Sequence, residues 1–510
     1  MRPPPYPFLA AVYLALVPIT QRGDLALSSD LVGSVFLAVT WTAVVWLATR
    51  RVGRDAHVRA LYTLLAVVWA GLFGTFQVVA SEAVGPWIGR PAIAFFSWTC
   101  ALGATGWAIR RISLNLGPVT RVANVATTLL LLVPVFTFVT VERRPSAGRE
   151  PLGVSDRRTL DRPDIYVIVL DKYTHPRWLS SEYGLDVRPF LDSLRGLGFV
   201  IPDSARTNYI HTSLVLATLL NGSYIHEVLG ADDRAGWAKV AEHIDDNRAQ
   251  SLAREYGYRF AFFPTSFPTT RTNRHADVTL AYPGRPRGAF GATWIANGPW
   301  PLFWRHMCRV LPCSVGQVFP YPVESAAALE WKLEQVAALP DSGGPILAIL
   351  HLLAPHEPYV FAGNCRHQTP FWPMSDVGRD SAEIVRSYAA QVQCVNRLVL
   401  RTVTDIIARS RVPPVILLQS DHGHGRIAID PMRGILLPLE ALSATQVAER
   451  TDVFAAYRFT GAAGAVWPSM SPVNVLPTVF NLVLGTSLPR HADRTYWSSF
   501  ARPLDLTEIP

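Results

Sequence analysis

Residues 165–171 read IYVIVLD, an unbroken run of six apolar residues that ends in an aspartate. The run does not alternate between apolar and polar side chains, so it predicts a central strand that helices cover on both faces. Similar runs follow at residues 259–263, 346–350 and 415–418. Residues 381–409 form a long amphipathic pattern at helical spacing that leads into the last run. This alternation of short strands and longer helices predicts an α/β fold with a mostly parallel central sheet.

Polar residues directly follow the first and last of these runs. Asp171 ends IYVIVLD, and Asp421, His422, Gly423, His424 and Gly425 come after VILLQS. Alone, Asp171 is better explained as a residue that caps the next turn. An exposed Asp-His pair after a buried strand has little packing use, however, and offers two metal ligands of different geometry. Ligands gather at the carboxyl ends of parallel strands, so the sequence predicts a metal site there.

Two histidines lie near the end of a third predicted strand, in HLLAPHEPY at 351–359. His351 is still on the strand, which favours a core or supporting role. His356 lies in a loop that prolines 355 and 358 stiffen. An imidazole there can hold an anion or donate a proton to a leaving group, so His356 is the better catalytic candidate.

Thr212 stands just before an apolar helical stretch, in NYIHTSLVLATLLNG at 208–222. Considered singly, it is best explained as the N-cap of that helix. A hydroxyl at a helix N-terminus is also a place where a nucleophile or a phosphate gains stabilisation. A nearby divalent ion would lower the pKa of such a hydroxyl.

The composition of the 510-residue chain indicates a membrane protein with more than one domain. Hydrophobic residues make up 49% of it and charged residues 17%, and the formal charge is +8. Apolar stretches that approach the roughly 20 residues needed to cross a bilayer occur before residue 145, at 7–20, 31–49, 60–80, 91–109 and 122–141. The first has a single Arg before it and no clear cleavage site after it, so we expect a retained helix instead of a signal peptide. The expected domains are a helical membrane domain at 1–142, a linker at 143–162 and a catalytic domain at 163–510.

Arginines in the short loops predict the orientation of the membrane domain. The loops after the second and fourth stretches are arginine-rich, whereas the loops after the first and third hold one Arg each. Positive loops stay in the cytoplasm, which places the N-terminus inside and the chain beyond about residue 142 outside. The basic residues do not form one aromatic-basic patch, so a nucleic-acid partner is not expected.

The cysteines agree with this orientation. Cys308, Cys313, Cys365 and Cys394 all lie in the part predicted to be outside, where two disulfides suit an oxidising compartment. Their connectivity cannot be deduced from the sequence. A local Cys308–Cys313 pair would leave Cys365 to pair with Cys394.

Four segments together resemble the alkaline phosphatase/sulfatase superfamily, over residues 163–500. Residues 212–222 are similar, in register, to the sulfatase signature C-x-P-S-R-x-x-L-L-T-G, with Thr212 at the nucleophile position. SDHG at 420–423 resembles the second metal motif, PHEP at 355–358 the histidine loop that binds the anion, and 474–489 the late helix. Sulfatases need Cys or Ser at the nucleophile position for conversion to formylglycine, and Leu214 and Leu216 replace the proline and arginine of the signature. The resemblance therefore disfavours sulfate-ester hydrolysis.

A threonine nucleophile behind N-terminal membrane helices resembles lipoteichoic acid synthase and the lipid A phosphoethanolamine transferases. This resemblance implies that one divalent metal ion is bound by Asp171, Thr212, Asp421 and His422, and that His356 contacts the phosphate. The expected ion is Mn or Zn, and Mg or Ca is the alternative. His424 and His491 are the candidates for a second ion. The implied reaction moves a phospho-head group from a phospholipid donor to an envelope glycan or lipid acceptor through a phospho-Thr intermediate, at the bacterial plasma (inner) membrane.

Two alternatives stay open at this point. The same site could pass the group to water and act as a phosphodiesterase or sulfatase-like hydrolase, because the acceptor pocket lies in loops that no motif describes. The chain could instead be an inert scaffold of the envelope. The altered signature and Lys172 beside a predicted ligand favour the scaffold, whereas intact Thr212, Asp421 and His422 favour an enzyme.

Overall fold

The computed structural model describes fifteen segments of the chain, which fall into two compact units. The described residues are 4–21, 28–51, 55–84, 88, 91–111, 116–142, 162–229, 236–283, 298–299, 324–342, 344–368, 381–426, 436–459, 463–500 and 502–509. One unit contains the N-terminal helices, and the other contains the elements from residue 162 onward.

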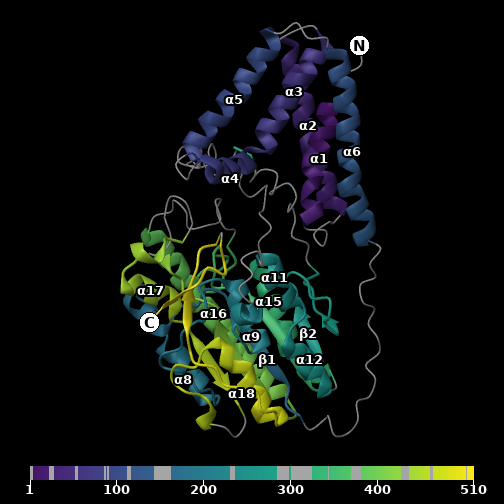
Figure 1. Ribbon diagram of the computed structural model, residues 1–510. Coiled ribbons are helices and arrows are strands. Elements are labelled where there is room, and N and C mark those ends of the chain that lie inside the picture. The colour runs from purple at the N-terminus through teal and green to yellow at the C-terminus, as the bar shows by residue number, and fades with distance from the viewer. Residues whose placement is uncertain are drawn as a thin grey trace. The chain divides into compact units, whose positions relative to one another are not determined.

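All the described secondary-structure elements of the N-terminal unit are helices (Figure 1). Its helices are α1 (Tyr6–Gln21), α2 (Ser28–Ala48), α3 (Ala56–Gly71), α4 (Phe73–Val84), α5 (Pro91–Arg111) and α6 (Leu116–Glu142). Helix α1 packs against α2, α3 and α6. Large apolar side chains face outward, among them Phe36 on α2 and Phe136 on α6, which are 71% and 70% exposed. An apolar outer surface is what a helix bundle presents to lipid.

Three of the five predicted spans lie in helices that are long and apolar enough to cross a membrane. The spanning windows are Val32–Arg51, Ala92–Ile109 and Leu116–Phe136. The prediction of five such helices is not met within the described residues. The first predicted stretch lies in α1, whose 16 residues extend about 24 Å. The third is divided at Leu72 into α3 and α4, because glycines at 71 and 74 weaken the helix there.

The second unit is built on a sheet with the strand order β3-β2-β4-β1-β5-β6. All neighbours pair in parallel except β6, which is antiparallel to β5 at the edge. The strands are β1 (Ile165–Leu170), β2 (Arg259–Phe263), β3 (Val278–Thr279), β4 (Ile346–Leu352), β5 (Val415–Ser420) and β6 (Ala455–Arg458), and β7 (Thr495–Trp497) and β8 (Thr507–Ile509) form a separate pair. The mostly parallel α/β fold predicted from the sequence is confirmed.

Helices cover both faces of this sheet, as the continuous apolar strands predict. Alternate side chains of β1 enter two different cores: Tyr166, Ile168 and Leu170 lie in one, and Ile165, Val167 and Val169 in the other. Helices α8 (Arg188–Gly196), α15 (Ala326–Ala337) and α16 (Ser381–Arg409) complete the first core. Helices α9 (Thr212–Asn221), α11 (Trp237–Asp245), α12 (Arg248–Glu255) and α18 (Pro472–Leu484) complete the second. The remaining helices are α7 (Pro176–Ser181), α10 (Ile225–Leu229) and α17 (Ala444–Thr451).

Candidate active site

Asp171 and Asp421 lie side by side because their strands are adjacent and parallel. Leu170 at the end of β1 pairs with Ser420 at the end of β5, so the next residue of each chain segment is a carboxylate. Asp421 Oδ1 accepts two main-chain hydrogen bonds, from Lys172 N at 2.9 Å and from His422 N at 2.8 Å. These bonds fix the side chain of Asp421 at the carboxyl edge of the sheet.

Asp171, Asp421 and His422 form a group that can hold a metal ion. One ligand atom from each lies within 4.8 Å of the others, and all three residues are buried. Within the described part of the chain, Asp171 Oδ1 and Asp421 Oδ2 have no hydrogen-bond partner. A buried carboxylate oxygen without a partner is costly, and a divalent cation removes that cost. The donor set of two carboxylates and an imidazole therefore fits a metal such as Zn or Mn.

The protonation states of these groups follow from burial and from their neighbours. Burial and the adjacent Asp171 carboxylate raise the pKa of Asp421 to about 6. Burial also opposes ionisation of Asp171, yet His356 and His351 beside it hold its pKa below the usual range. Burial and the charge of Arg450 lower the pKa of His422, which keeps the imidazole neutral and able to bind a metal.

Thr212 faces His422 from the start of α9. Its Oγ1 lies 3.3 Å from His422 Nε2. The N-cap of the helix is His211, with extended φ and ψ of −119° and 127°, and Thr212 is the first helical residue. The prediction that Thr212 is the N-cap was therefore wrong by one residue. The Thr212 hydroxyl therefore lies at the N-terminus of the helix, where an anion is stabilised.

The two histidines of the HLLAPHEPY segment have different environments. His351 lies on β4 and is buried, with Nδ1 3.0 Å from Thr270 Oγ1 and Nε2 3.3 Å from Asp171 Oδ2. His351 thus lies on the strand and is buried, as the sequence predicts for a core or supporting residue. The His356 side chain is 36% exposed, and its main-chain N–H donates to Asp171 O at 3.1 Å. The structure thus brings His356 beside the carboxylate group and leaves its ring accessible to a substrate.

Contacts that no sequence pattern indicated hold the His356 loop in place. Lys172 Nζ forms a buried ion pair with Glu357 Oε2 at 2.5 Å. Gln391 on α16 donates to the carbonyls of Pro355 and His356, at 3.1 and 2.8 Å, and accepts from Val360 N at 2.7 Å. The sequence shows Lys172 directly after Asp171, but no local pattern identifies Glu357 as its partner.

His424 and His491 do not join the group of metal ligands among the described residues. His424 Nε2 lies 3.1 Å from the Tyr359 hydroxyl, and its ring packs edge-on against Tyr388. The main chain of His491 is bonded to the side chain of Asn474. The suggestion that either residue binds a second ion therefore has no support from these contacts.

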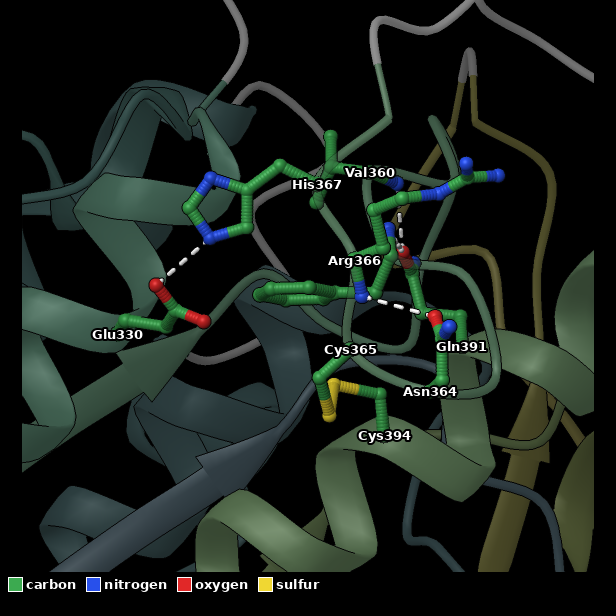
Figure 2. The surroundings of a disulfide bond; sticks show 9 residues. Glu330, Val360, Asn364, Cys365, Arg366, His367, Gln391 and Cys394 are labelled. Carbon is green, nitrogen blue, oxygen red and sulfur yellow. Dashed lines mark hydrogen bonds and ion pairs between the residues drawn. A yellow bond between two sulfur atoms is a disulfide. The ribbon is translucent and has the colours of Figure 1, made fainter.

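A disulfide joins Cys365 to Cys394 on α16. This is one of the two pairs that the sequence predicts. Figure 2 shows this bond beside Gln391, which lies on the same helix and holds Val360. Cys308 and Cys313, the other predicted pair, lie outside the described residues. Cys100 is a free and exposed cysteine.

Comparisons with known proteins identify the family. A profile of the sulfatase family matches residues 163–486. No curated protein matches the chain at a significant level. Similar solved structures include the integral membrane lipooligosaccharide phosphoethanolamine transferase A of Neisseria meningitidis, with 14% identity, a TM-score of 0.44 and 94% of each chain covered. The C-terminal periplasmic domain of EcEptC from Escherichia coli, in a complex with Zn, has 12% identity and a TM-score of 0.43, with 70% of this chain and 96% of that chain covered.

The profile supports the resemblance that the sequence motifs predicted. It begins just before β1 and includes Asp171, Thr212, His356, Asp421 and His422. Because the matched region covers more than half of the chain, the protein belongs to the sulfatase family.

Proposed function

We propose that the protein is a membrane-anchored, metal-dependent phosphotransferase that uses Thr212 as its nucleophile. The observation that carries this proposal is the approach of Thr212 Oγ1 to His422 Nε2, at 3.3 Å, beside two carboxylates with open oxygens. Asp171, Asp421 and His422 would hold the ion. When bound, a divalent ion supplies positive charge that acidifies a nearby hydroxyl and offsets charge on phosphoryl oxygens.

The protein side chains then perform a two-step transfer. The Thr212 hydroxyl gives its proton to solvent, and its oxygen attacks the phosphorus of a phosphodiester head group. The bond from phosphorus to the leaving oxygen breaks, His356 gives that oxygen a proton, and a phospho-Thr ester remains. In the second step His356 takes a proton from the hydroxyl of the acceptor. The acceptor oxygen bonds to phosphorus, the bond from phosphorus to Thr212 Oγ1 breaks, and Thr212 regains a proton from solvent. The N-terminus of α9, where Thr212 lies, stabilises the negative charge of the phosphoryl group in both steps.

The residue at position 212 also separates this reaction from sulfate-ester hydrolysis. Threonine cannot be converted to formylglycine, whereas its secondary hydroxyl is a suitable phosphoryl acceptor. Phospholipid is a fitting donor because helices with an apolar outer surface would hold the chain in a bilayer. An envelope glycan or lipid is the proposed acceptor.

We further propose a bacterial plasma membrane location with the catalytic unit outside the cytoplasm. The loop arginines favour this orientation. The Cys365–Cys394 disulfide also favours it, because disulfides persist in oxidising compartments. The domain division at 1–142, 143–162 and 163–510 belongs to the same proposal.

The test is the release of p-nitrophenol from a phosphodiester, a phosphomonoester and a sulfate ester by the full-length protein in detergent. Each assay is run with added Zn or Mn and repeated with Thr212→Ala. Thr218→Ala is the matched control, because Thr218 is another buried hydroxyl on α9 that lies six residues further along the helix. We expect metal-dependent diesterase activity that Thr212→Ala abolishes and Thr218→Ala retains. Sulfatase activity would refute the proposal in favour of a hydrolase of another kind. No activity together with no retained metal would refute it in favour of a scaffold.

A further inference from the structure

Arg450 on α17 is a buried cation that bonds to two segments of the candidate site. Only 6% of the residue is exposed. Its Nη2 donates to Ile210 O at 2.7 Å, and its Nη1 donates to the carbonyls of Gly423 and His424 at 3.3 and 3.4 Å. One guanidinium therefore joins the chain just before Thr212 to the chain just after His422.

The carbonyl of Gly423 connects Arg450 to the ring of His422. His422 Nδ1 lies 3.0 Å from Gly423 O. A carbonyl can only accept, so Nδ1 carries the proton in this bond and Nε2 keeps its lone pair. That lone pair points to the side of the ring on which Thr212 Oγ1 lies, 3.3 Å away. The Arg450 bond to the same carbonyl holds the orientation of the ring.

The other end of the guanidinium acts on Thr212. Ile210 precedes His211, the N-cap of α9, so the position of its carbonyl sets where the helix begins. A change in that start would move the first residue of the helix, which is Thr212. Both members of the Thr212–His422 pair thus depend on one side chain from a third element.

Glycines at 423 and 425 allow this close approach. A Cβ on Gly423 would lie 2.0 Å from Glu449 O, and a Cβ on Gly425 would lie 2.6 Å from Arg450 Cδ. Gly425 also has a φ of +62°, which favours glycine. In addition, Gly423 N donates to Arg450 O at 2.8 Å. The turn after His422 is therefore packed directly on the last turn of α17.

We propose that Arg450 is a positioning residue that sets the distance and orientation of Thr212 and His422 for metal binding and phosphoryl transfer. The inference rests on the proposed function and extends it to a residue outside the predicted motifs. Lysine cannot replace Arg450, because a single ammonium cannot reach carbonyls on both sides as a planar guanidinium does.

The chain provides a matched control in Arg458 on β6. Arg458 Nε donates to Leu197 O at 3.0 Å and its Nη1 donates to Pro414 O at 2.7 Å. Pro414 precedes β5, so these bonds lie at the opposite end of that strand from Asp421. Arg458→Met removes a guanidinium that joins two main-chain segments without touching the candidate site.

The experiment compares Arg450→Lys, Arg450→Met and Arg458→Met in the full-length protein in detergent. The melting temperature, the Kd for Zn²⁺ by competition with a chromophoric chelator, and kcat and KM on a p-nitrophenyl phosphodiester are measured. We expect both Arg450 variants to bind Zn²⁺ about 10- to 100-fold more weakly, which is the usual effect of losing a residue that orients a metal ligand. We expect kcat to fall by a similar factor with KM nearly unchanged. Arg458→Met should lower only the melting temperature.

The Zn²⁺ measurement keeps this inference separate from the proposed function. A wild-type protein that binds Zn²⁺ but cleaves no phosphoester would refute the function, and the Zn²⁺ affinities of the variants would still decide the role of Arg450. Wild-type Zn²⁺ affinity in Arg450→Lys overturns the inference. So does a loss of affinity that Arg458→Met reproduces, since the effect would then be general destabilisation. A wild-type protein that binds neither Zn²⁺ nor Mn²⁺ overturns both.

Discussion

Replacing both cysteines of the Cys365–Cys394 disulfide by serine should destabilise the catalytic unit without changing its chemistry. The bond closes a loop between residues 29 apart in the sequence. Its removal restores chain entropy to the unfolded state, which for a loop of this length corresponds to about 3.5 kcal/mol at 25 °C. The double variant avoids the mispaired thiol that a single substitution would leave.

The catalytic rate should be retained because bonds other than the disulfide hold the His356 loop in place. Gln391 bonds to both ends of the segment from Pro355 to Val360, and these bonds do not involve the disulfide. We therefore expect kcat of the folded double-serine variant to stay within about threefold of the wild-type value. Gln391→Ala leaves the main-chain groups of Pro355, His356 and Val360 without these hydrogen bonds. This variant should therefore lower kcat much more than the double-serine variant does.

Urea unfolding of the full-length protein, followed by tryptophan fluorescence, measures the free energy. Substitution is preferred to a reducing agent because a reductant would also break a Cys308–Cys313 disulfide, the other pair that the sequence predicts. Cys100→Ser is the control, since Cys100 is free, and it should leave the free energy of unfolding unchanged. A double-serine variant within about 1 kcal/mol of the wild-type protein would refute the reasoning on stability. A loss of kcat as large as that of Gln391→Ala would refute the separation of the two roles.

Three further substitutions test other parts of the account. Gly423→Ala forces a Cβ to 2.0 Å from Glu449 O, so we expect a lower melting temperature, a loss on the order of 1–3 kcal/mol, and weaker Zn²⁺ binding. Burial raises the pKa of Asp164 to about 6 in the folded protein, above the value in the unfolded chain. The folded state therefore favours the neutral carboxyl group, whose stabilising contribution is present near pH 4 and is lost as the pH rises through 6. Asp164→Asn should therefore stabilise the protein at pH 7.5, by about 3 kcal/mol at most, and have little effect at pH 4; urea titrations at both values check this. Asp493 accepts hydrogen bonds from Trp467 Nε1 and from Ser471 N and Oγ, so Asp493→Ala should cost about 3 kcal/mol in the same assay, and equal stability would contradict it.

The central strands could be predicted because their burial on both faces leaves a continuous apolar run. Strands β1 and β2 begin and end where the sequence predicts. Strands β4 and β5 each continue two residues further, to Leu352 and Ser420. Polar residues such as His351 and Gln419 still pair within the sheet, so a change to polar residues does not mark the end of a buried strand. Helix α16 has the predicted bounds, since its amphipathic pattern is unbroken.

The edge elements and the supporting contacts could not be predicted in this way. Strands β3 and β6 are two and four residues long and carry little pattern. The break between α3 and α4 depends on glycines within a stretch that is apolar throughout. The structure places Asp171, Asp421 and His422 near one another and Thr212 beside His422, and their roles as metal ligands and nucleophile stay predictions. The side-chain contacts of Lys172, Gln391 and Arg450 join residues up to 240 positions apart, which no local spacing reveals.

The most direct test of the central claim is to trap the phosphorylated enzyme. Full-length protein with Zn²⁺ is mixed with a phosphodiester substrate, quenched in acid within the first turnover, digested and analysed by mass spectrometry. We expect a substrate-derived phosphoryl group on Thr212, which appears with the first equivalent of leaving group and disappears when acceptor is added. Full turnover with an unmodified Thr212, or activity that persists in Thr212→Ala, would contradict it.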